Sequence, residues 1–187
     1  MKVLVACEYS GIVRDAFLSK GHEAISCDVL PTESPGPHHQ GDVRDILYDD
    51  WDMIIAHPPC TRLTLAGVRW LHERNLWEDL DDACDFFRIF LDHPCERVAI
   101  ENPLPHGHAT KRIGRKYDQR IQPWQFGHGE TKGICLWLKG LPHLAPTNIV
   151  EGREARVHMC PPGPDRAKIR SRFFDGVATA MADQWGK

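Results

Sequence analysis

Short runs of uninterrupted apolar residues recur along the chain, and polar residues follow most of them directly. A continuous apolar run of this length is typical of a strand that is buried on both faces of a parallel sheet. The pattern predicts strands at residues 3–6, 24–28, 52–56, 97–100 and 134–138.

Helical periodicity appears between and after these runs. The apolar residues between 12 and 17 fall on one helical face, with Ser10 in position to cap the helix and Gly21 in position to end it. The same spacing predicts helices over residues 80–91 and 174–185. Strands that alternate with helices predict an α/β fold, with a mostly parallel, doubly wound sheet and helices on both faces.

A proline-rich segment follows the second predicted strand. Residues 31–40 contain three prolines, a glycine and the pair His38-His39, which predicts a loop. Two adjacent histidines need further ligands to hold a metal ion, and the sequence identifies none, so we predict no metal site.

Polar clusters stand at the ends of the predicted strands or just beyond them. They are residues 8–11, Asp28, Gly41-Asp42, residues 58–60 and residues 101–103. Doubly wound sheets bind their ligands at the carboxyl ends of the strands, so we expect these clusters to meet in one cleft.

Length and composition favour one ordered domain over residues 1–187, because 42% of the residues are hydrophobic and 26% are charged. The net charge of -3 gives no overall attraction to nucleic acid. Any contact with DNA therefore has to come from a local basic run, unless that run is only a solvated surface. The run consists of Arg153, Arg156, Arg166, Lys168, Arg170 and Arg172.

The cysteines and the apolar segments bear on the cellular compartment. The seven cysteines show no paired spacing, so neither a disulfide framework nor a structural zinc site is predicted. The apolar start of the chain is too short for a signal peptide, and no apolar stretch reaches the 18 residues of a membrane span. We expect a cytoplasmic protein without a membrane partner.

Cys60 is the strongest candidate for chemistry. Carbon 5 of cytosine is a weak nucleophile, and adding a thiolate to carbon 6 activates it. A cysteine on the proline-stiffened turn Pro58-Pro59-Cys60 at a strand end would be held still and face the cleft. Most of the other cysteines are better interpreted as buried structural residues.

Glu101 is the candidate for the acid that the thiolate addition needs. Adding a thiolate to carbon 6 pushes electron density onto the ring, and a carboxylic acid at ring nitrogen 3 can stabilise it with a proton or a hydrogen bond. Taken alone, Glu101 could equally be a solvated or helix-capping carboxylate.

The order of these motifs along the chain resembles that of the cytosine-C5 DNA methyltransferase family, and most of all its short phage-type members. The resemblance implies a Rossmann-like class I methyltransferase fold, S-adenosylmethionine as cofactor and DNA as partner. It places Cys60 as nucleophile and Glu101 as its acid. It assigns cofactor binding to the loop Cys7, Glu8, Tyr9, Ser10 and Gly11, to Asp28 at the ribose, to Asp42 at the adenine, and also to Val29, Val43 and Pro58. The terminal helix resembles the one that closes the cofactor pocket.

The chain also departs from the family pattern. Its cofactor loop has one glycine where the family usually has three, and Ala56-His57 replaces the usual Gly-Gly before the proline pair. The family's Gln-x-Arg-x-Arg motif is not intact, which leaves Arg120, or else Arg62, to steady the ring carbonyl. Only residues 138–173 separate Trp137 from the terminal helix, so no separate target-recognition domain is expected.

Two other functions remain open at this point. The same thiolate could act on a free pyrimidine nucleotide or an already modified base, with phosphate held by cations at Arg112, Arg115, Arg120 and Lys132. The protein could instead be a degenerate methyltransferase that only binds. Trp124 or Phe126 could stack on a base, although aromatic residues are more often part of the core.

Overall fold

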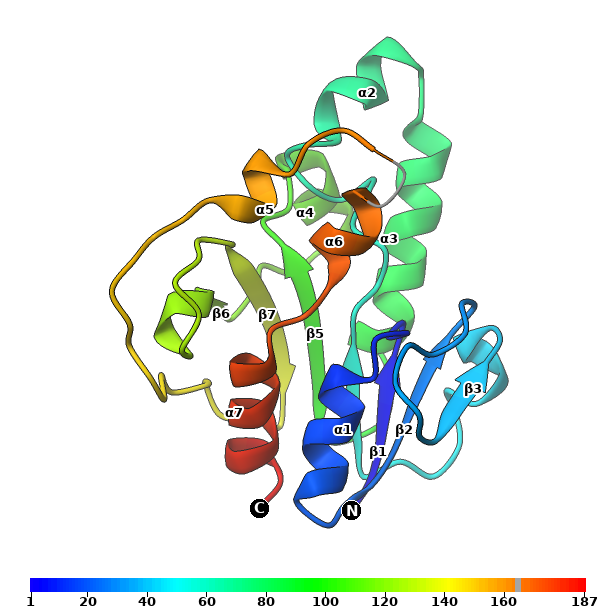
Figure 1. Cartoon of the computed structure of the whole chain (residues 1–187). Coiled ribbons are helices and arrows are strands. Elements are labelled where there is room, and N and C mark those ends of the chain that lie inside the picture. The colour runs from blue at the N-terminus through cyan, green and yellow to red at the C-terminus, as the bar shows by residue number, and fades with distance from the viewer. Residues whose placement is uncertain (164–165) are drawn as a thin grey trace.

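A seven-stranded sheet forms the centre of the molecule (Figure 1). The computed structural model describes residues 1–163 and 166–187, with the backbone alone at residues 158, 167 and 168. Within these residues the strand order is β3-β2-β1-β4-β5-β7-β6. The strands are β1 (Lys2–Ala6), β2 (Glu23–Asp28), β3 (His38–Gln40), β4 (Met53–Ala56), β5 (Val98–Pro103), β6 (Gln119–Ile121) and β7 (Ile134–Lys139).

Strand direction confirms the predicted mostly parallel sheet. β1 pairs in parallel with β2 and β4, β2 with β3, and β4 with β5. β7 runs antiparallel to both β5 and β6, so it alone is reversed. The parallel strands therefore end on the same side of the sheet, with the carboxyl ends of β2 and β4 flanking that of β1.

Helices cover both faces of the sheet, as the sequence predicts (Figure 1). The α-helices are α1 (Ile12–Ser19), α2 (Val68–Glu73), α3 (Trp77–Leu91), α4 (Gly107–Ile113), α5 (Arg156–Met159), α6 (Arg166–Ser171) and α7 (Asp175–Trp185). Short 3-10 helices occur at η1 (Val43–Asp45) and η2 (Pro123–Gln125). Among the described residues, no helix is long and apolar enough to cross a membrane.

Alternation along β1 shows how one strand serves two cores. Val3 and Val5 pack with α1 and α7 on one face, whereas Leu4 and Ala6 pack with α3 and α4 on the other. All four side chains are inaccessible to solvent. In a strand that is buried on both faces, neither set of alternating side chains contacts water. Every position is therefore apolar, which explains the continuous apolar run of β1.

The structure corrects the prediction of a loop over residues 31–40, because His38–Gln40 forms the edge strand β3. Polar contacts hold the His38 side chain at this edge of the sheet. Its ring nitrogens lie 2.9 Å from Ser26 Oγ and 3.0 Å from the Leu30 carbonyl. A three-residue strand with polar side chains at a sheet edge lacks the apolar run on which the prediction depends.

Candidate active site

The polar clusters after β1 and β4 and at the end of β5 meet around one cavity of about 140 Å³ at the carboxyl ends of the strands. Two further segments, Lys132 and residues 170–173, complete its wall. The lining residues are Cys7, Glu8, Tyr9, Ser10, His57, Pro58, Pro59, Cys60, Glu101, Asn102, Pro103, Lys132, Arg170, Ser171, Arg172 and Phe173. Sequence positions as distant as 7 and 173 thus share one site.

Backbone contacts fix the turn that carries Cys60. The His57 N–H donates to the Ala6 carbonyl at 2.9 Å, which continues the β4 pairing past the end of the strand. Asn102 Nδ2 donates to the buried Pro58 carbonyl at 2.8 Å, and the Cys60 carbonyl accepts from the Leu63 N–H at 3.0 Å. The turn is held on both sides of the proline pair, so the Cys60 backbone has little freedom.

The Cys60 thiol experiences opposing influences. Burial raises the pKa of this thiol above its ordinary value, and the neighbouring Glu101 carboxylate raises it further. The positive charges of Lys132 and Arg170 lower it. Cys60 therefore rests as a thiol, and neutralising Glu101 would favour the thiolate.

Glu101 lies at the end of β5, with 9% of its surface exposed. Its Oε2 is 3.1 Å from His57 Nδ1, and both side chains are nearly buried. Oε1 accepts no hydrogen bond from the described residues, so this oxygen is available to a ligand in the cavity.

The C-terminal segment 170–173 covers the cavity. Phe173 packs edge-on against the His57 ring with centroids 4.9 Å apart, and the Tyr9 hydroxyl lies 2.9 Å from Ser171 Oγ. Lys132 Nζ donates to the Arg170 carbonyl at 3.0 Å. These contacts hold the end of α6 and the residues that follow it beside the nucleophile.

The predicted basic run is divided by the structure. Arg153 lies over the Trp124 ring at 3.9 Å, and Arg156 forms an ion pair with Glu130. The Lys168 side chain lies outside the described residues, and Arg166 does not line the cavity. Arg170 and Arg172 line the cavity, and neither pairs with a carboxylate in the described part of the chain.

The loop after β1 is shaped by the start of α1. Glu8 accepts hydrogen bonds from the Val13 N–H at 2.7 Å and the Arg14 N–H at 3.3 Å, so its carboxylate caps the helix. Ser10, the predicted cap, has a longer bond to the Ile12 N–H at 3.3 Å. The N-cap residue itself is Gly11. Its φ of 76° favours glycine, and the Cβ of any other residue at this position would collide with the Arg14 guanidinium.

The predicted ribose and adenine carboxylates lie beside the cavity rather than in its wall. Asp28 Oδ1 accepts from the Leu30 N–H at 2.9 Å, and Asp42 accepts from the Arg44 N–H at 2.9 Å. Both carboxylates raise the pKa of the Cys7 thiol, although burial raises it most. Cys7 lines the cavity and also experiences the negative charge of both acids.

The two hydrophobic residues assigned to cofactor binding differ in exposure. Val29 is 71% exposed beyond the end of β2, whereas Val43 is buried at the start of η1. Only Val29 presents its side chain to a ligand at the surface.

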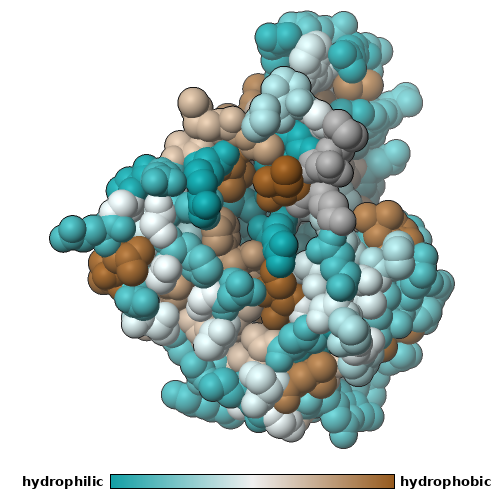
Figure 2. All heavy atoms as spheres, viewed as in Figure 1, coloured by the Kyte–Doolittle hydropathy of each residue, from teal (hydrophilic) through white to brown (hydrophobic). Residues whose placement is uncertain are grey.

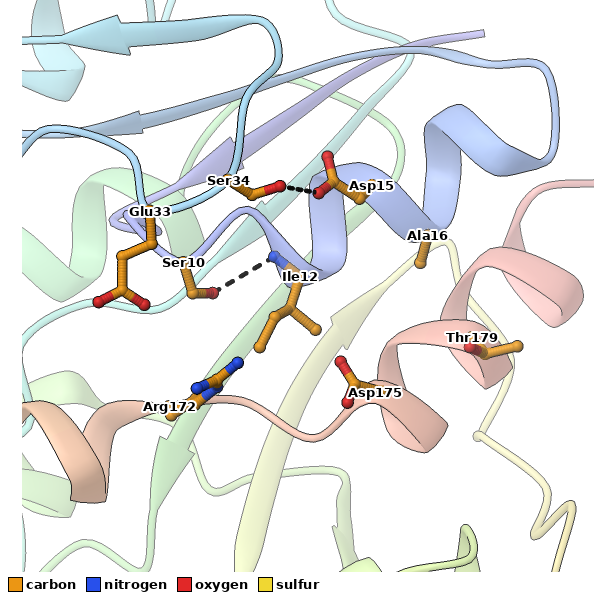
Figure 3. Close-up of a pocket in the computed structure, with 9 residues that line it drawn as sticks. All are labelled: Ser10, Ile12, Asp15, Ala16, Glu33, Ser34, Arg172, Asp175 and Thr179. Carbon is orange, nitrogen blue, oxygen red and sulfur yellow. Dashed lines mark hydrogen bonds between the residues drawn. The ribbon is translucent and has the colours of Figure 1, made fainter.

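A second cavity of about 360 Å³ lies between α1 and α7, and Figure 3 shows the side chains around it. It holds three carboxylates, Asp15, Glu33 and Asp175, with Arg172 reaching toward them. Ser34 Oγ donates to Asp15 Oδ2 at 2.7 Å and thereby ties the loop after β2 to α1. Arg172 lines both cavities, so the two sites are neighbours.

Several candidate cations do not reach the cavity. Arg120 on β6 is exposed beside Gly133, and Arg62 donates to Asp79 at 2.8 Å. Arg112 and Arg115 form ion pairs with Asp81 and Asp118 respectively.

Phe126 is 2% exposed and belongs to the core, as the preferred interpretation of it predicts. Among the described residues, no group of three or more metal-ligating side chains comes together.

Sequence reasoning assigned neither Ser171 nor Phe173 to the site, and it named His57, Lys132 and Arg170 without placing them in this cavity. Of these, only His57 carried a local signal, because it stands where the resembled family usually has glycine. The others reach the cavity from segments whose positions depend on tertiary packing.

Hydrophobic and polar residues are mixed on the surface around these sites. In the face shown by Figure 2, the hydrophobic residues are scattered among hydrophilic ones rather than joined in one broad patch. The exposed apolar side chains near the C-terminal segment are Met159 and Ile169.

The sequence matches no known family model, and no curated protein is detectably similar to it. Solved structures are similar in fold. One is an Escherichia coli prophage protein described as a DNA modification methyltransferase, with 13% identity, a TM-score of 0.51, and coverage of 81% of this chain and 52% of that one. Another is the Entamoeba histolytica methyltransferase EhMeth, with 13% identity, a TM-score of 0.49, and coverage of 82% and 57%.

This chain thus spans little more than half the length of either structure. The strand order with a single reversed strand, the helices on both faces and the prophage protein's similarity agree on one architecture. The chain has the Rossmann-like fold of the class I methyltransferases.

Proposed function

We propose that this protein is an S-adenosylmethionine-dependent DNA methyltransferase that modifies carbon 5 of cytosine through a covalent bond to Cys60. The observation that carries the proposal is the shared cavity of Cys60, Glu101 and the loop after β1. The similarity in fold to a prophage protein described as a DNA modification methyltransferase supports it.

The residues around the cavity fit S-adenosylmethionine by their chemistry. Asp28 stands at the carboxyl end of β2 and uses one carboxylate oxygen for Leu30, which leaves the other free to accept from ribose hydroxyls. Cys7 to Ser10 would border the methionine portion, with Val29 and Asp42 nearer the adenine. When bound, S-adenosylmethionine supplies an electrophilic methyl group.

Glu8 has a different role from the one that a cofactor-binding carboxylate would have. Its oxygens already accept from the Val13 and Arg14 N–H groups and from the Ser10 hydroxyl. Glu8 therefore sets the shape of the loop, and backbone groups of Tyr9 and Ser10 are the better candidates for direct cofactor contacts.

Cys60 and Glu101 can perform the covalent step. Transfer of the Cys60 thiol proton to the Glu101 carboxylate would supply both the thiolate and the acid. The thiolate then forms an Sγ–C6 bond, the C5=C6 electron pair moves toward nitrogen 3, and Glu101 donates that proton there through Oε1. The activated carbon 5 would then take the methyl group from S-adenosylmethionine, whose sulfur–methyl bond would break to leave S-adenosylhomocysteine. Loss of the carbon-5 proton to solvent breaks the Sγ–C6 bond, and nitrogen 3 returns its proton to Glu101.

Charge around the cavity favours this sequence. Protonated Glu101 no longer opposes ionisation of Cys60, while Lys132 and Arg170 continue to favour the thiolate. The same cations, with Arg172, line the cavity and would hold a phosphate next to the target base. A base in duplex DNA must leave the stack first, at a cost of a few kcal/mol that such contacts offset.

Transfer of labelled methyl groups from S-adenosylmethionine to DNA tests the proposal. Cys60→Ser should abolish transfer without unfolding the protein, whereas Cys95→Ser should leave it unchanged, because Cys95 is also half-buried but remote from the cavity. DNA that contains 5-fluorocytosine should form a covalent adduct with the wild type and not with Cys60→Ser.

The same assay separates the alternatives. Labelling of free pyrimidine nucleotides but not of DNA would favour the nucleotide-modifying enzyme. Binding of S-adenosylmethionine and DNA with no transfer and no adduct would indicate a degenerate binding protein. Mass spectrometry of nucleosides from cells that make the wild type or Cys60→Ser would identify the modified base directly.

A further inference from the structure

His57 contributes an imidazole to the cavity at a position where the resembled family usually has no side chain. The residue follows β4 directly, and its backbone N–H is bound to the Ala6 carbonyl, so its location is fixed by the sheet. Its side chain is 12% exposed, with the edge of Phe173 packed against it. Such a constrained ring can hold a neighbouring group in one orientation.

The neighbouring group is the carboxylate of Glu101. His57 Nδ1 lies 3.1 Å from Glu101 Oε2, and the two residues come from adjacent parallel strands. An ionised carboxylate can only accept, so the Nδ1–H of His57 must be the donor in this state. The contact therefore selects the tautomer in which Nδ1 carries the proton.

The other ring nitrogen is consistent with this tautomer. His57 Nε2 is buried and has no hydrogen-bond partner among the described residues. A buried acceptor without a hydrogen bond costs less free energy than a buried N–H without one. Proteins accordingly leave buried N–H groups unpaired more rarely than buried acceptors. The neutral ring with its proton on Nδ1 then satisfies Glu101 and leaves no donor unpaired.

The consequence concerns the second oxygen of Glu101. With Oε2 held by His57, rotation of the carboxyl group is restricted and Oε1 remains directed to the cavity. The acid that protonates ring nitrogen 3 must stay within a few tenths of an ångström of its productive position. Nothing else in the described part of the chain bonds to this carboxylate.

We propose that His57 is a positioning residue, which holds Glu101 through an Nδ1–H···Oε2 hydrogen bond so that Oε1 faces the pyrimidine. This inference rests on the proposed function, because Glu101 is its acid. It also explains how a histidine replaces glycine in this motif: the ring takes over the orientation of the carboxyl group.

Two substitutions separate positioning from simple packing. In His57→Asn, the side-chain amide can place a donor close to the position of Nδ1, whereas His57→Leu fills similar space without a donor. We expect His57→Leu to lower kcat by roughly 10- to 100-fold with little change in KM for DNA. His57→Asn should restore most of the loss, and thermal unfolding should show that both variants are folded.

The rate of adduct formation with 5-fluorocytosine DNA should follow the same order, because it reports the addition step itself. A folded His57→Leu with the kcat of the wild type would overturn the inference. So would a folded His57→Asn that is as slow as His57→Leu, because a donor near Nδ1 would then not suffice.

A measurement without catalysis tests the contact independently. Nitrogen-15 NMR of the wild-type protein should show His57 with its proton on Nδ1, whether or not the protein methylates DNA. A neutral His57 ring with its proton on Nε2 alone would refute the hydrogen bond. If the wild type has the expected tautomer but neither transfers methyl groups nor forms the adduct, the proposed function fails while the His57–Glu101 contact stands.

Discussion

Asn102 links the two catalytic turns, and its truncation should weaken both the fold and the reaction. It is 1% exposed and donates from Nδ2 to the buried Pro58 carbonyl at 2.8 Å. Asn102→Ala leaves that carbonyl without its partner, which costs about 1–3 kcal/mol. The Asn102 Oδ1 is itself buried without a partner among the described residues, so removing it offsets part of the loss. We expect a net destabilisation of about 1–2 kcal/mol.

For a chain of this length, that change lowers the unfolding temperature by about 2–8 °C. The turn before Cys60 also loses one of its two anchors, so we expect adduct formation with 5-fluorocytosine DNA to slow by roughly tenfold or more. Thermal unfolding and single-turnover trapping measure the two effects separately.

Two other asparagine variants sharpen this experiment. Asn102→Asp keeps the shape but replaces the donor with a carboxylate oxygen beside the Pro58 carbonyl, so it should destabilise more than alanine does. Asn148→Ala, at an exposed loop position, should change stability by no more than about 0.5 kcal/mol. The reasoning is refuted if Asn102→Ala matches Asn148→Ala in unfolding temperature and traps DNA as fast as the wild type.

Further predictions follow from the cap, the thiol and the cations. Glu8→Ala should lower the free energy of unfolding by about 0.5–2 kcal/mol, measured by urea titration, because the cap of α1 is lost. Alkylation of Cys60 should accelerate with rising pH toward a midpoint above 9.0, and Glu101→Gln should move that midpoint down, because it removes a charge that disfavours the thiolate. Arg170→Gln and Arg172→Gln should each weaken oligonucleotide binding and reduce its salt dependence by about one phosphate contact, measured by fluorescence anisotropy.

Each of these predictions has its own counter-result. Unchanged stability of Glu8→Ala would mean that Ser10 or water satisfies the start of α1. A Cys60 alkylation midpoint below 9.0 would contradict the influence of burial. Arg120→Gln is the matched control for the cation variants, because Arg120 is exposed and does not line the cavity; an equal loss of binding there would argue against a local phosphate site.

Local patterning was sufficient for most of the framework. The apolar runs predicted the places of β1, β2, β4, β5 and β7, and helical spacing predicted α1, α3 and α7. A strand with two buried faces must be apolar throughout, and a helix on a sheet must be apolar along one stripe, so burial leaves a periodic signal. The short elements β3 and β6 bury too little to leave one.

The sequence by itself also determined which residue types were available for chemistry. A proline-stiffened cysteine and an acid, each directly after an apolar run, were sufficient to expect Cys60 and Glu101 at one edge of the sheet. That expectation depends only on parallel strands ending together.

Tertiary structure alone decided which side chains surround that pair. Lys132 and Phe173 reach the cavity because β7 is reversed and the segment before α7 crosses the strand ends, and neither arrangement has a local signal. The same holds for the contact of His57 with Glu101, which joins residues 44 positions apart. Strand pairing and helix docking are set by the packing of segments that are distant in sequence, and periodicity within one segment does not encode them.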